Sequence, residues 1–292
     1  MALTFKPLSA GIGVEVIGVD FSRPLDEASV AQIQRAWDEH CVILFRNANI
    51  TNKQHVEFSR NFGPLDNHDL IARLRDPENP EILPVTPQQE GGRTLVVGRQ
   101  WHTDMSCTET PPKGSLLRCE VIPDIGGDTM FANMYLAYDA LSDTMKKLLE
   151  GLEAIHDLRV AKHNRGQDPA TVLARTPPVA HPIVRVHPGS GRKALYISEM
   201  TCAGIVGMKH EESKPILEYL FQHCVQPEFT YRHSWSVGDM IGWDNRSTIH
   251  LALADYDFKA PRKLYRTTLL GEKVGRVLPV DAVPQFNYDP RA

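Results

Sequence analysis

The order of apolar and polar positions predicts alternating strands and helices in the first fifth of the chain. Residues 14–19 are apolar enough for a strand, and a helical spacing of apolar residues begins after Asp26. Residues 41–45 are continuously apolar, which is typical of a strand buried on both faces. Thr51 and Gln54 have the spacing of a capping box. We therefore expect strand, helix, strand and helix in this order.

After residue 64 the pattern changes to short β-like runs that are interrupted by Gly and Pro. The expected strands cover 81–85, 93–97, 115–121, 229–235, 239–243, 249–253 and 264–270, with a hairpin over 182–197. Helical spacing recurs only over 133–150 and 216–224. Many short strands with few helices predict a mainly β fold with helical decoration, of the sandwich or jelly-roll type.

Two polar segments interrupt this pattern. Residues 88–92 end in two glycines and indicate a mobile loop. Residues 159–178 end in Pro177-Pro178, and we interpret them as an insertion or lid, because long irregular segments in compact domains are often functional. The length of 292 residues suits a single large β domain over 1–292.

Composition narrows the class of protein. The chain is 42% apolar and 23% charged with a net charge of -4, so it lacks the basic balance that nucleic-acid binding needs. We find no signal peptide and no apolar run long enough to span a membrane. The five cysteines are scattered without a CxxC pair, which favours a reducing, cytoplasmic setting, and Cys119 and Cys224 suit buried positions. A homo-oligomer is compatible with this composition.

Candidate chemistry begins with Trp101-His102-Thr103-Asp104. In an extended segment the side chains of His102 and Asp104 project to the same side and can reach one ion. His250, expected early in the strand 249–253, adds a second imidazole from a β scaffold. Two histidines and one carboxylate suit non-haem Fe(II) with open coordination positions, although a zinc hydrolase could use similar ligands.

Arg262 and Arg266 follow in the last expected strand and share a face with Leu264 between them. Arginine grips a carboxylate through two parallel hydrogen bonds. Surface arginines are common, so this pair alone would not define a site.

Several segments together resemble the family of taurine dioxygenase and 2,4-dichlorophenoxyacetate dioxygenase, from Gly18-Val19-Asp20 to about Gly271. They are Phe62-Gly63-Pro64, Trp101-His102-Thr103-Asp104, Gly126-Gly127-Asp128-Thr129, His187–Lys193, Trp243-Asp244-Asn245-Arg246, and Arg262 with Arg266. The resemblance implies a double-stranded β-helix (jelly roll) and an enzyme that uses Fe(II), O2 and 2-oxoglutarate as cosubstrate.

The resemblance also implies roles for individual residues. The implied metal ligands are His102, Asp104 and His250, with no catalytic residue beyond them. The residues implied for 2-oxoglutarate are Thr129, Arg262 and Trp243. Those implied for a small anionic organic substrate are Arg266 and His68, a pair we expect to be cationic, with positions 71 and 98 beside them.

The chain departs from taurine dioxygenase at Gly98, where that enzyme has asparagine, and at Ile71, where it has tyrosine. The loop over 255–261 is one residue longer. These differences count against taurine itself and leave the implied iron and cosubstrate positions intact. Because Asp104 supplies the carboxylate ligand, the resemblance implies hydroxylation rather than halogenation.

The expected reaction is hydroxylation of a small organic acid, such as a sulfonate or an aryloxyalkanoate, with cleavage beside the hydroxylated carbon where a heteroatom is attached. The alternatives are a metal-dependent hydrolase or isomerase on a β-barrel, and a catalytically silent binding domain. A hydrolase has no need of a dicarboxylate clamp formed by Thr129 and Arg262.

Overall fold

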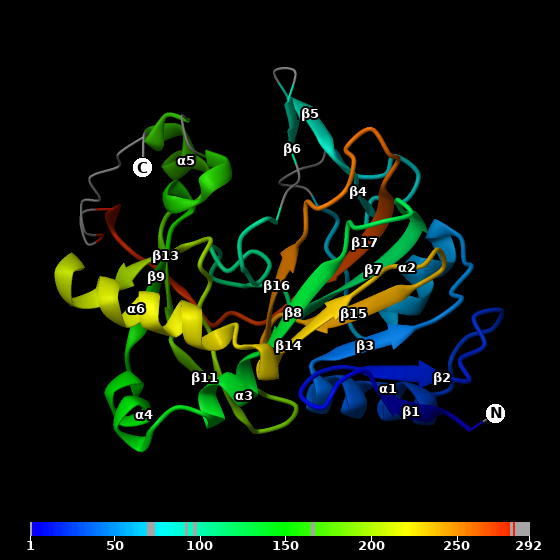
Figure 1. Cartoon of the computed structure of the whole chain (residues 1–292), viewed down its shortest axis with the longest axis horizontal. Helices are drawn as coiled ribbons and strands as arrows, with labels where there is room; N and C mark the ends of the chain where they lie inside the picture. The colour runs from blue at the N-terminus through cyan, green and yellow to red at the C-terminus, as the bar shows by residue number, and fades with distance from the viewer. Residues whose placement is uncertain are drawn as a thin grey trace.

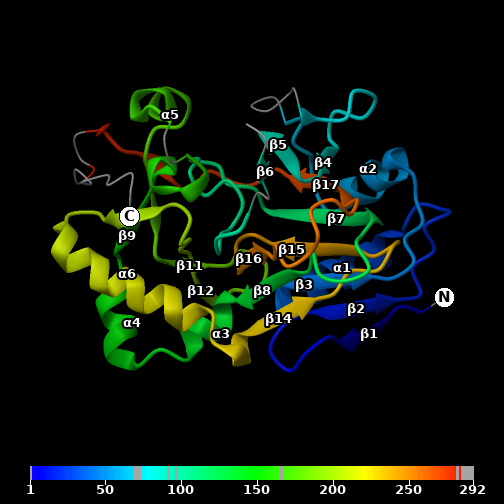
Figure 2. The same ribbon diagram turned by 45° about the horizontal axis from the view of Figure 1, so that its top comes forward.

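The computed structural model describes residues 2–68, 74–90, 93–95, 98–164, 167–280 and 283. Two sheets of seven and three strands fill one half of the molecule, and the other half carries β9, β13 and the helices α4 to α6 (Figures 1 and 2). This arrangement is mainly β with helices on the outside, as the sequence predicts.

The seven-stranded sheet has the spatial order β1 (Thr4–Pro7), β2 (Val14–Ile17), β3 (Val42–Phe45), β15 (Met240–Asp244), β7 (Gly114–Val121), β17 (Lys263–Leu269) and β4 (Leu83–Val85). The three-stranded sheet has the order β14 (Thr230–His233), β8 (Thr129–Asn133) and β16 (Thr248–Ala252). Neighbouring strands are antiparallel except β2 and β3, which are parallel.

The remaining strands form smaller sheets. A four-stranded sheet has the order β13 (Cys202–Ile205), β9 (Glu153–His156), β10 (Val179–Pro182) and β18 (Arg276–Val277). Two hairpins join β11 (Val184–Val186) to β12 (Lys193–Leu195) and β5 (Gln88–Glu90) to β6 (Arg93–Leu95). The helices are α1 (Glu27–His40), α2 (Asn52–Arg60), α3 (Met134–Asp139), α4 (Asp143–Leu149), α5 (Pro169–Arg175) and α6 (His210–Cys224), with 3-10 turns η2 (Leu158–Val160), η3 (Lys162–Asn164) and η4 (Pro227–Phe229).

The central strands β3 and β15 of the seven-stranded sheet are buried on both faces, which explains the continuous apolar run of β3. Along β3, Val42 and Leu44 pack into the core between the two sheets, whereas Ile43 and Phe45 pack under the helices α1 and α2. Trp37 of α1 belongs to this outer layer. Side chains on the inner face of the sheet therefore point toward the three-stranded sheet, and the candidate site lies on that side.

The predicted helix starts are confirmed. The Asp26 side chain accepts a hydrogen bond from the backbone N–H of Ser29 at the start of α1. Thr51 and Gln54 form the complete capping box at the start of α2. A side-chain cap of this kind satisfies backbone donors that the first helical turn leaves free.

Some expected segments differ in detail. Residues 88–90, expected in a loop, form β5 and pair with β6, whereas 91–92 lie outside the described residues. The helix expected over 133–150 is two helices, because Ser142 caps the second one through the backbone N–H of Met145. The segment 159–178 contains part of η2, η3 and α5 in its described part, and its function as a lid stays a prediction.

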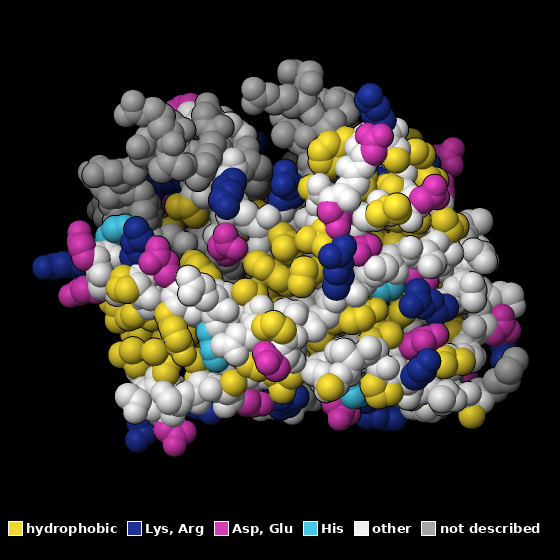
Figure 3. Space-filling view, in the orientation of Figure 1, with side chains coloured by type: hydrophobic (Ala, Val, Ile, Leu, Met, Phe, Trp, Pro, Cys, Tyr) yellow, Lys and Arg dark blue, Asp and Glu magenta, His cyan; other side chains and the backbone are white. Residues whose placement is uncertain are grey.

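All five cysteines are buried free thiols, Cys119 and Cys224 among them. Among the described helices none is both long and apolar enough to cross a membrane. On the face shown in Figure 3, acidic and basic side chains are interspersed around hydrophobic ones.

Candidate metal centre and active site

His102, Asp104 and His250 converge from two parts of the chain that are far apart in sequence. One ligand atom from each lies within 4.8 Å of the other two, and all three side chains are buried. The backbones of His102 and His250 form an isolated β-bridge, with N–H to carbonyl distances of 3.0 and 2.7 Å. The segment is extended only at His102, because Asp104 already begins a turn.

The path of the chain explains how His250 reaches this place. β15 ends at Asp244 in the seven-stranded sheet, and a turn over 245–247 carries the chain into β16 of the three-stranded sheet. His250 lies in the middle of β16, and its ring centroid is 4.7 Å from that of Trp243 on β15. The predicted strand–turn–strand is confirmed, and the turn links the two sheets.

The imidazoles present a nitrogen lone pair to the centre of the cluster. Nδ1 of His102 lies 2.7 Å from the carbonyl oxygen of Gln100, so it carries the proton and leaves Nε2 free. Burial lowers the pKa of His102 and lowers that of His250 to about 3. Both rings are therefore neutral at pH 7, the form that binds a metal ion.

Asp104 is held as a carboxylate. Burial opposes its ionisation, but the charge of Arg266, together with the hydrogen bond from Ser115, outweighs burial and holds the pKa of Asp104 well below the usual range. Oδ1 accepts a hydrogen bond from Nη1 of Arg266 at 3.0 Å, and Oδ2 accepts one from Ser115 Oγ at 2.8 Å. A buried carboxylate with two neutral imidazoles is a hard and borderline donor set that fits a divalent transition metal.

Asn245 connects the metal cluster to the turn after β15. Its Oδ1 accepts hydrogen bonds from Trp243 Nε1 at 3.0 Å and from the backbone N–H of Asp104 at 3.3 Å. Its backbone carbonyl accepts one from Thr103 Oγ1 at 2.7 Å. The sequence pattern offered Asn245 only as part of a motif, and its function in holding the His102–Asp104 segment was missed.

Arg262 is a buried cation near the end of the same inner face. Its side chain donates to the carbonyl oxygen of Gly127 from Nη2 at 3.1 Å and from Nε at 3.3 Å, and burial lowers its pKa. Within the described part of the chain Arg262 forms no ion pair. A buried guanidinium without an acid partner is unfavourable unless an anion joins it, so this position suits a ligand carboxylate.

Thr129 and Trp243, the other residues predicted for the cosubstrate, are also buried on this side. Thr129 begins β8, and its Oγ1 accepts a hydrogen bond from Trp235 Nε1 at 3.1 Å. That acceptance leaves the hydroxyl hydrogen of Thr129 available for a carboxylate.

The residues predicted for the substrate lie around Arg266, which projects from the inner face of β17 like Leu264. His68 is buried, and its pKa is lowered by burial first and by the charge of Arg266 second. The expected cationic pair is therefore one arginine and one neutral histidine at pH 7. Gly98 lies beside His102, because a Cβ at position 98 would be 3.0 Å from Cε1 of that ring. Ile71 lies outside the described residues.

A second cluster is formed by Asp38, His187 and Asp244. One ligand atom from each of these residues also lies within 4.8 Å of the other two. Here both ring nitrogens of His187 are engaged: Nδ1 accepts from the backbone N–H of Ser190 at 3.0 Å, and Nε2 donates to Asp244 at 3.0 Å. Arg246 pairs with both carboxylates. This cluster is an ion-pair network in which the imidazole has no free nitrogen for a metal ion.

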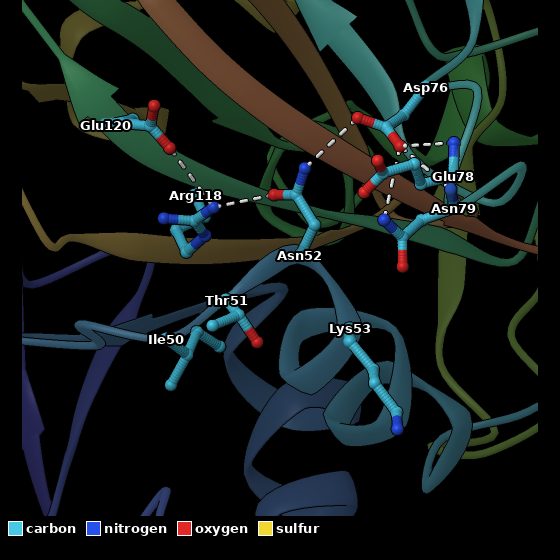
Figure 4. Close-up of a pocket in the computed structure, with 9 residues that line it drawn as sticks. All are labelled: Ile50, Thr51, Asn52, Lys53, Asp76, Glu78, Asn79, Arg118 and Glu120. Carbon is cyan, nitrogen blue, oxygen red and sulfur yellow. Dashed lines mark hydrogen bonds and ion pairs between the residues drawn. The ribbon is translucent and has the colours of Figure 1, made fainter.

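A cavity of about 460 Å³ lies near the start of α2, lined by residues such as Asn52, Arg118 and Glu120 (Figure 4). The Arg118 guanidinium donates to Asn52 Oδ1 at 2.8 Å and lies 3.5 Å from a Glu120 oxygen. None of the predicted site residues lines this cavity, so it is separate from the candidate metal centre.

Comparison with known proteins agrees with this geometry. The family model described as taurine catabolism dioxygenase TauD, TfdA family, matches residues 4–268. The chain is 34% identical to an alpha-ketoglutarate-dependent 2,4-dichlorophenoxyacetate dioxygenase of Cupriavidus pinatubonensis over 288 residues, which cover 94% of this chain and 100% of that one. It is also 34% identical to an alpha-ketoglutarate-dependent sulfate ester dioxygenase of Pseudomonas putida over 292 residues, covering 93% and 91%.

Solved structures show the same fold. A crystal structure of a taurine dioxygenase from Burkholderia xenovorans superimposes with a TM-score of 0.81 at 36% identity, covering 96% of this chain and 97% of that one. A crystal structure of AAD-2 in complex with Mn(II) and N-oxalylglycine gives a TM-score of 0.82 at 30% identity, covering 94% and 98%.

The chain belongs to the TauD, TfdA family. Its core is the jelly roll of that family, and it is an oxidoreductase of the Fe(II)- and 2-oxoglutarate-dependent dioxygenase class that uses O2. The expected family, fold and reaction class are thereby confirmed. The two alternatives, a metal-dependent hydrolase or isomerase and a catalytically silent binding domain, are not supported.

Proposed function

We propose that His102, Asp104 and His250 are the ligands of Fe(II) in this enzyme. The observation that carries this assignment is the convergence of three buried ligand atoms within 4.8 Å, two of them on imidazoles whose lowered pKa values keep them neutral. Three protein ligands leave further coordination positions open for reactants. With iron bound, the site supplies oxidative decarboxylation of 2-oxoglutarate coupled to oxidation of a substrate C–H bond.

Arg262, Thr129 and Trp243 form the proposed cosubstrate site. The Arg262 guanidinium binds the distal carboxylate of 2-oxoglutarate, because it is buried and has no acid partner among the described residues. Thr129 donates its hydroxyl hydrogen to the same carboxylate. Trp243 packs beside His250 and excludes water from the metal-binding end of the site.

The proposed substrate is a small organic anion, and the proposed reaction is its hydroxylation. Arg266 is the cation that meets it, and His68 is a neutral hydrogen-bonding neighbour. Arg266 pairs with Asp104 at 3.0 Å, so an acidic substrate would compete with this carboxylate for the guanidinium. The relatives that act on 2,4-dichlorophenoxyacetate and sulfate esters support an acidic substrate. Hydroxylation next to an ether or ester oxygen would split such a molecule.

Gly98 supports a substrate wider than taurine. Its φ is +83°, and any side chain there would press on His102. The absence of a side chain leaves space beside the metal-binding ring. Position 71 and the segment 159–178 remain candidate walls of the same site.

The test is a screen for succinate formation with Fe(II), 2-oxoglutarate and O2 over aryloxyalkanoates, alkyl sulfonates and sulfate esters. We expect one class of acid to stimulate succinate formation, and its neutral amide or ester to fail. Arg266→Ala should lose the preference for the acid over its neutral analogue. Undiminished turnover of the acid by that variant would contradict the proposed substrate site.

Binding provides a readout that does not depend on turnover. Calorimetric titration of N-oxalylglycine, an unreactive isostere of 2-oxoglutarate, into protein loaded with Mn(II) should give one site per chain. Arg262→Ala should abolish this binding, whereas Arg118→Ala, another buried arginine at the separate cavity near α2, should preserve it. Equal binding by both variants would rule out Arg262 as the clamp.

A further inference from the structure

The Gly126-Gly127 pair lies between Arg262 and the chain that follows β16. Both glycines have positive φ, +77° and +73°. A Cβ at position 126 would lie 2.4 Å from the carbonyl oxygen of Asp255, and one at 127 would lie 3.2 Å from Nε of Arg262. The turn therefore requires glycine twice, both for its backbone conformation and for the close approach on each side.

The backbone of Gly127 makes hydrogen bonds on both sides of its Cα. Its carbonyl oxygen accepts two hydrogen bonds from Arg262, at 3.1 and 3.3 Å. Its N–H donates to Oδ1 of Asp255 at 2.9 Å. The N–H and the carbonyl belong to consecutive peptide groups joined at the Gly127 Cα, so the backbone conformation of Gly127 couples the position of Arg262 to the position of the Asp255 carboxylate.

Asp255 is fixed in turn by Arg232 of β14. Nη2 of Arg232 donates to Asp255 Oδ2 at 2.7 Å, and Nε donates to Asp128 Oδ2 at 2.7 Å. Asp128 also accepts from Ser234 Oγ at 3.0 Å. We call Arg232, Asp128 and Asp255 the surface clasp, since it joins β14, the start of β8 and the chain after β16 next to the glycine pair.

We propose that the surface clasp is a positioning device for the cosubstrate: it holds the Gly127 carbonyl so that Arg262 keeps its free edge directed at the distal carboxylate of 2-oxoglutarate. This inference rests on the proposed function of Arg262. Arg232 and Asp255 act through the backbone of Gly127 and touch no reactant, so they are positioning residues.

The exposure of the clasp separates this role from a structural one. The side chains of Arg232 and Asp255 are 51% and 40% exposed, whereas that of Asp128 is 9% exposed. An ion pair as exposed as Arg232–Asp255 contributes little to folding stability. If the Arg232–Asp255 pair served stability alone, its loss would lower folding stability slightly and leave the affinity for the cosubstrate unchanged. A positioning role predicts a selective effect on the affinity for the cosubstrate.

The experiment compares Arg232→Ala with a matched control, Arg276→Ala. Arg276 is 52% exposed and forms a comparable ion pair with Glu153, away from the glycine pair. Titration of N-oxalylglycine into Mn(II)-loaded Arg232→Ala should show about fivefold weaker binding, a coupling of ordinary size. The KM for 2-oxoglutarate should rise in parallel while kcat changes little, and Arg276→Ala should behave as wild type. Asp255→Ala, which keeps the Arg232–Asp128 pair, should show the same rise in KM with little change in Tm.

A thermodynamic cycle sharpens the test. Asp255→Ala should weaken binding at least as much as Arg232→Ala, and the double variant should bind no more weakly than Asp255→Ala alone, because Arg232 reaches Gly127 through Asp255. Arg232→Lys, which keeps the charge but cannot span both carboxylates, should fall between wild type and Arg232→Ala.

The outcomes distinguish a failure of the clasp from a failure of the proposed function of Arg262 on which it rests. If Arg262→Ala abolishes binding but Arg232→Ala and Asp255→Ala bind as wild type, the clasp has no positioning role and the proposed function stands. If the variants lose kcat and Tm with an unchanged KM, the clasp is structural. If wild-type protein binds no N-oxalylglycine, both the proposed cosubstrate site and the clasp are overturned.

Discussion

Two clusters of histidine and aspartate in this enzyme bring their ligand atoms equally close together, but differ in whether the imidazole nitrogens are free to bind a metal ion. His102, Asp104 and His250 form one, and Asp38, His187 and Asp244 form the other, each with ligand atoms within 4.8 Å. They differ in what already occupies the lone pairs. In the first cluster only the carboxylate is paired with a cation, through Arg266, whereas in the second Arg246 binds both carboxylates and both nitrogens of His187 are engaged. Proximity of ligand-type residues is therefore insufficient to define a metal site.

The two clusters are also neighbours. Asp244 and Asn245 are consecutive, and Asn245 bonds to the backbone of Asp104. The ion-pair network thus anchors the turn from which Asn245 holds the His102–Asp104 segment. A rigid structural cluster next to a metal cluster is one way to keep ligands in place before the metal binds. The following experiments test the two roles separately.

The largest effect is expected from Asp104→Ala, which removes the only carboxylate of the first cluster. Affinity for Mn(II) should fall by more than about 100-fold, beyond the loss typical of residues outside the ligand set. Calorimetric titration measures the affinity, and succinate formation should vanish with it. Metal binding close to wild type would remove Asp104 from the proposed ligands.

His187→Ala should break the second cluster in a different way. It leaves Asp244 and Arg246 buried without the imidazole, and the free energy of unfolding should fall by about 3 kcal/mol. Urea denaturation gives this value, with Mn(II) stoichiometry as the control, which should remain one per chain. Loss of the metal from a variant that is still folded would mean that the second cluster takes part in metal binding.

Metal addition distinguishes the clusters in one measurement. Mn(II) at about 100 times its Kd should raise the free energy of unfolding by about 2.7 kcal/mol, because it binds the folded state. Wild type and His187→Ala should both gain this amount, and Asp104→Ala should gain none. Equal stabilisation of Asp104→Ala would place the ion elsewhere.

The smallest effect is expected from Asn245→Ala, which removes the link between the clusters. The His102–Asp104 segment loses its bonds to the Asn245 side chain, so Mn(II) affinity should fall about tenfold, as for other residues that orient ligands. Asn133→Ala is the matched control, since Asn133 is a buried amide that caps α3. Stability should fall for both variants, and metal affinity only for Asn245→Ala.

The sequence predicted local features well where local physics decides them. The capping box at Thr51 and the buried strand predicted over 41–45 follow from neighbouring residues, and both are confirmed, the strand as Val42–Phe45. The break of the predicted helix 133–150 at Ser142 was missed. A serine side chain can either continue a helix or cap a new one, and the apolar spacing does not distinguish the two. Pairing of 88–90 with β6 was missed because polar side chains carry no alternating pattern.

The candidate site residues were found from spacing and family resemblance, but their protonation states could not be predicted in this way. The sequence suggested a cationic pair of Arg266 and His68, whereas burial and the arginine lower the pKa of that histidine. Asn245 and the surface clasp were also missed. The bonds Asn245–Asp104, Gly127–Asp255 and Arg232–Asp128 each join residues more than 100 positions apart in sequence, and no spacing rule connects them.

By itself the sequence determined which residue types are available for iron, a dicarboxylate and an acidic substrate, since these follow from side-chain chemistry and motif order. The tertiary structure decided which of two similar clusters has free lone pairs. It also decided that Arg262 is buried without an acid partner among the described residues and that the backbone of Gly127 links this arginine to a surface ion pair. The physical reason is that lone-pair occupancy and burial depend on contacts between distant segments, which form only when the two sheets close on each other.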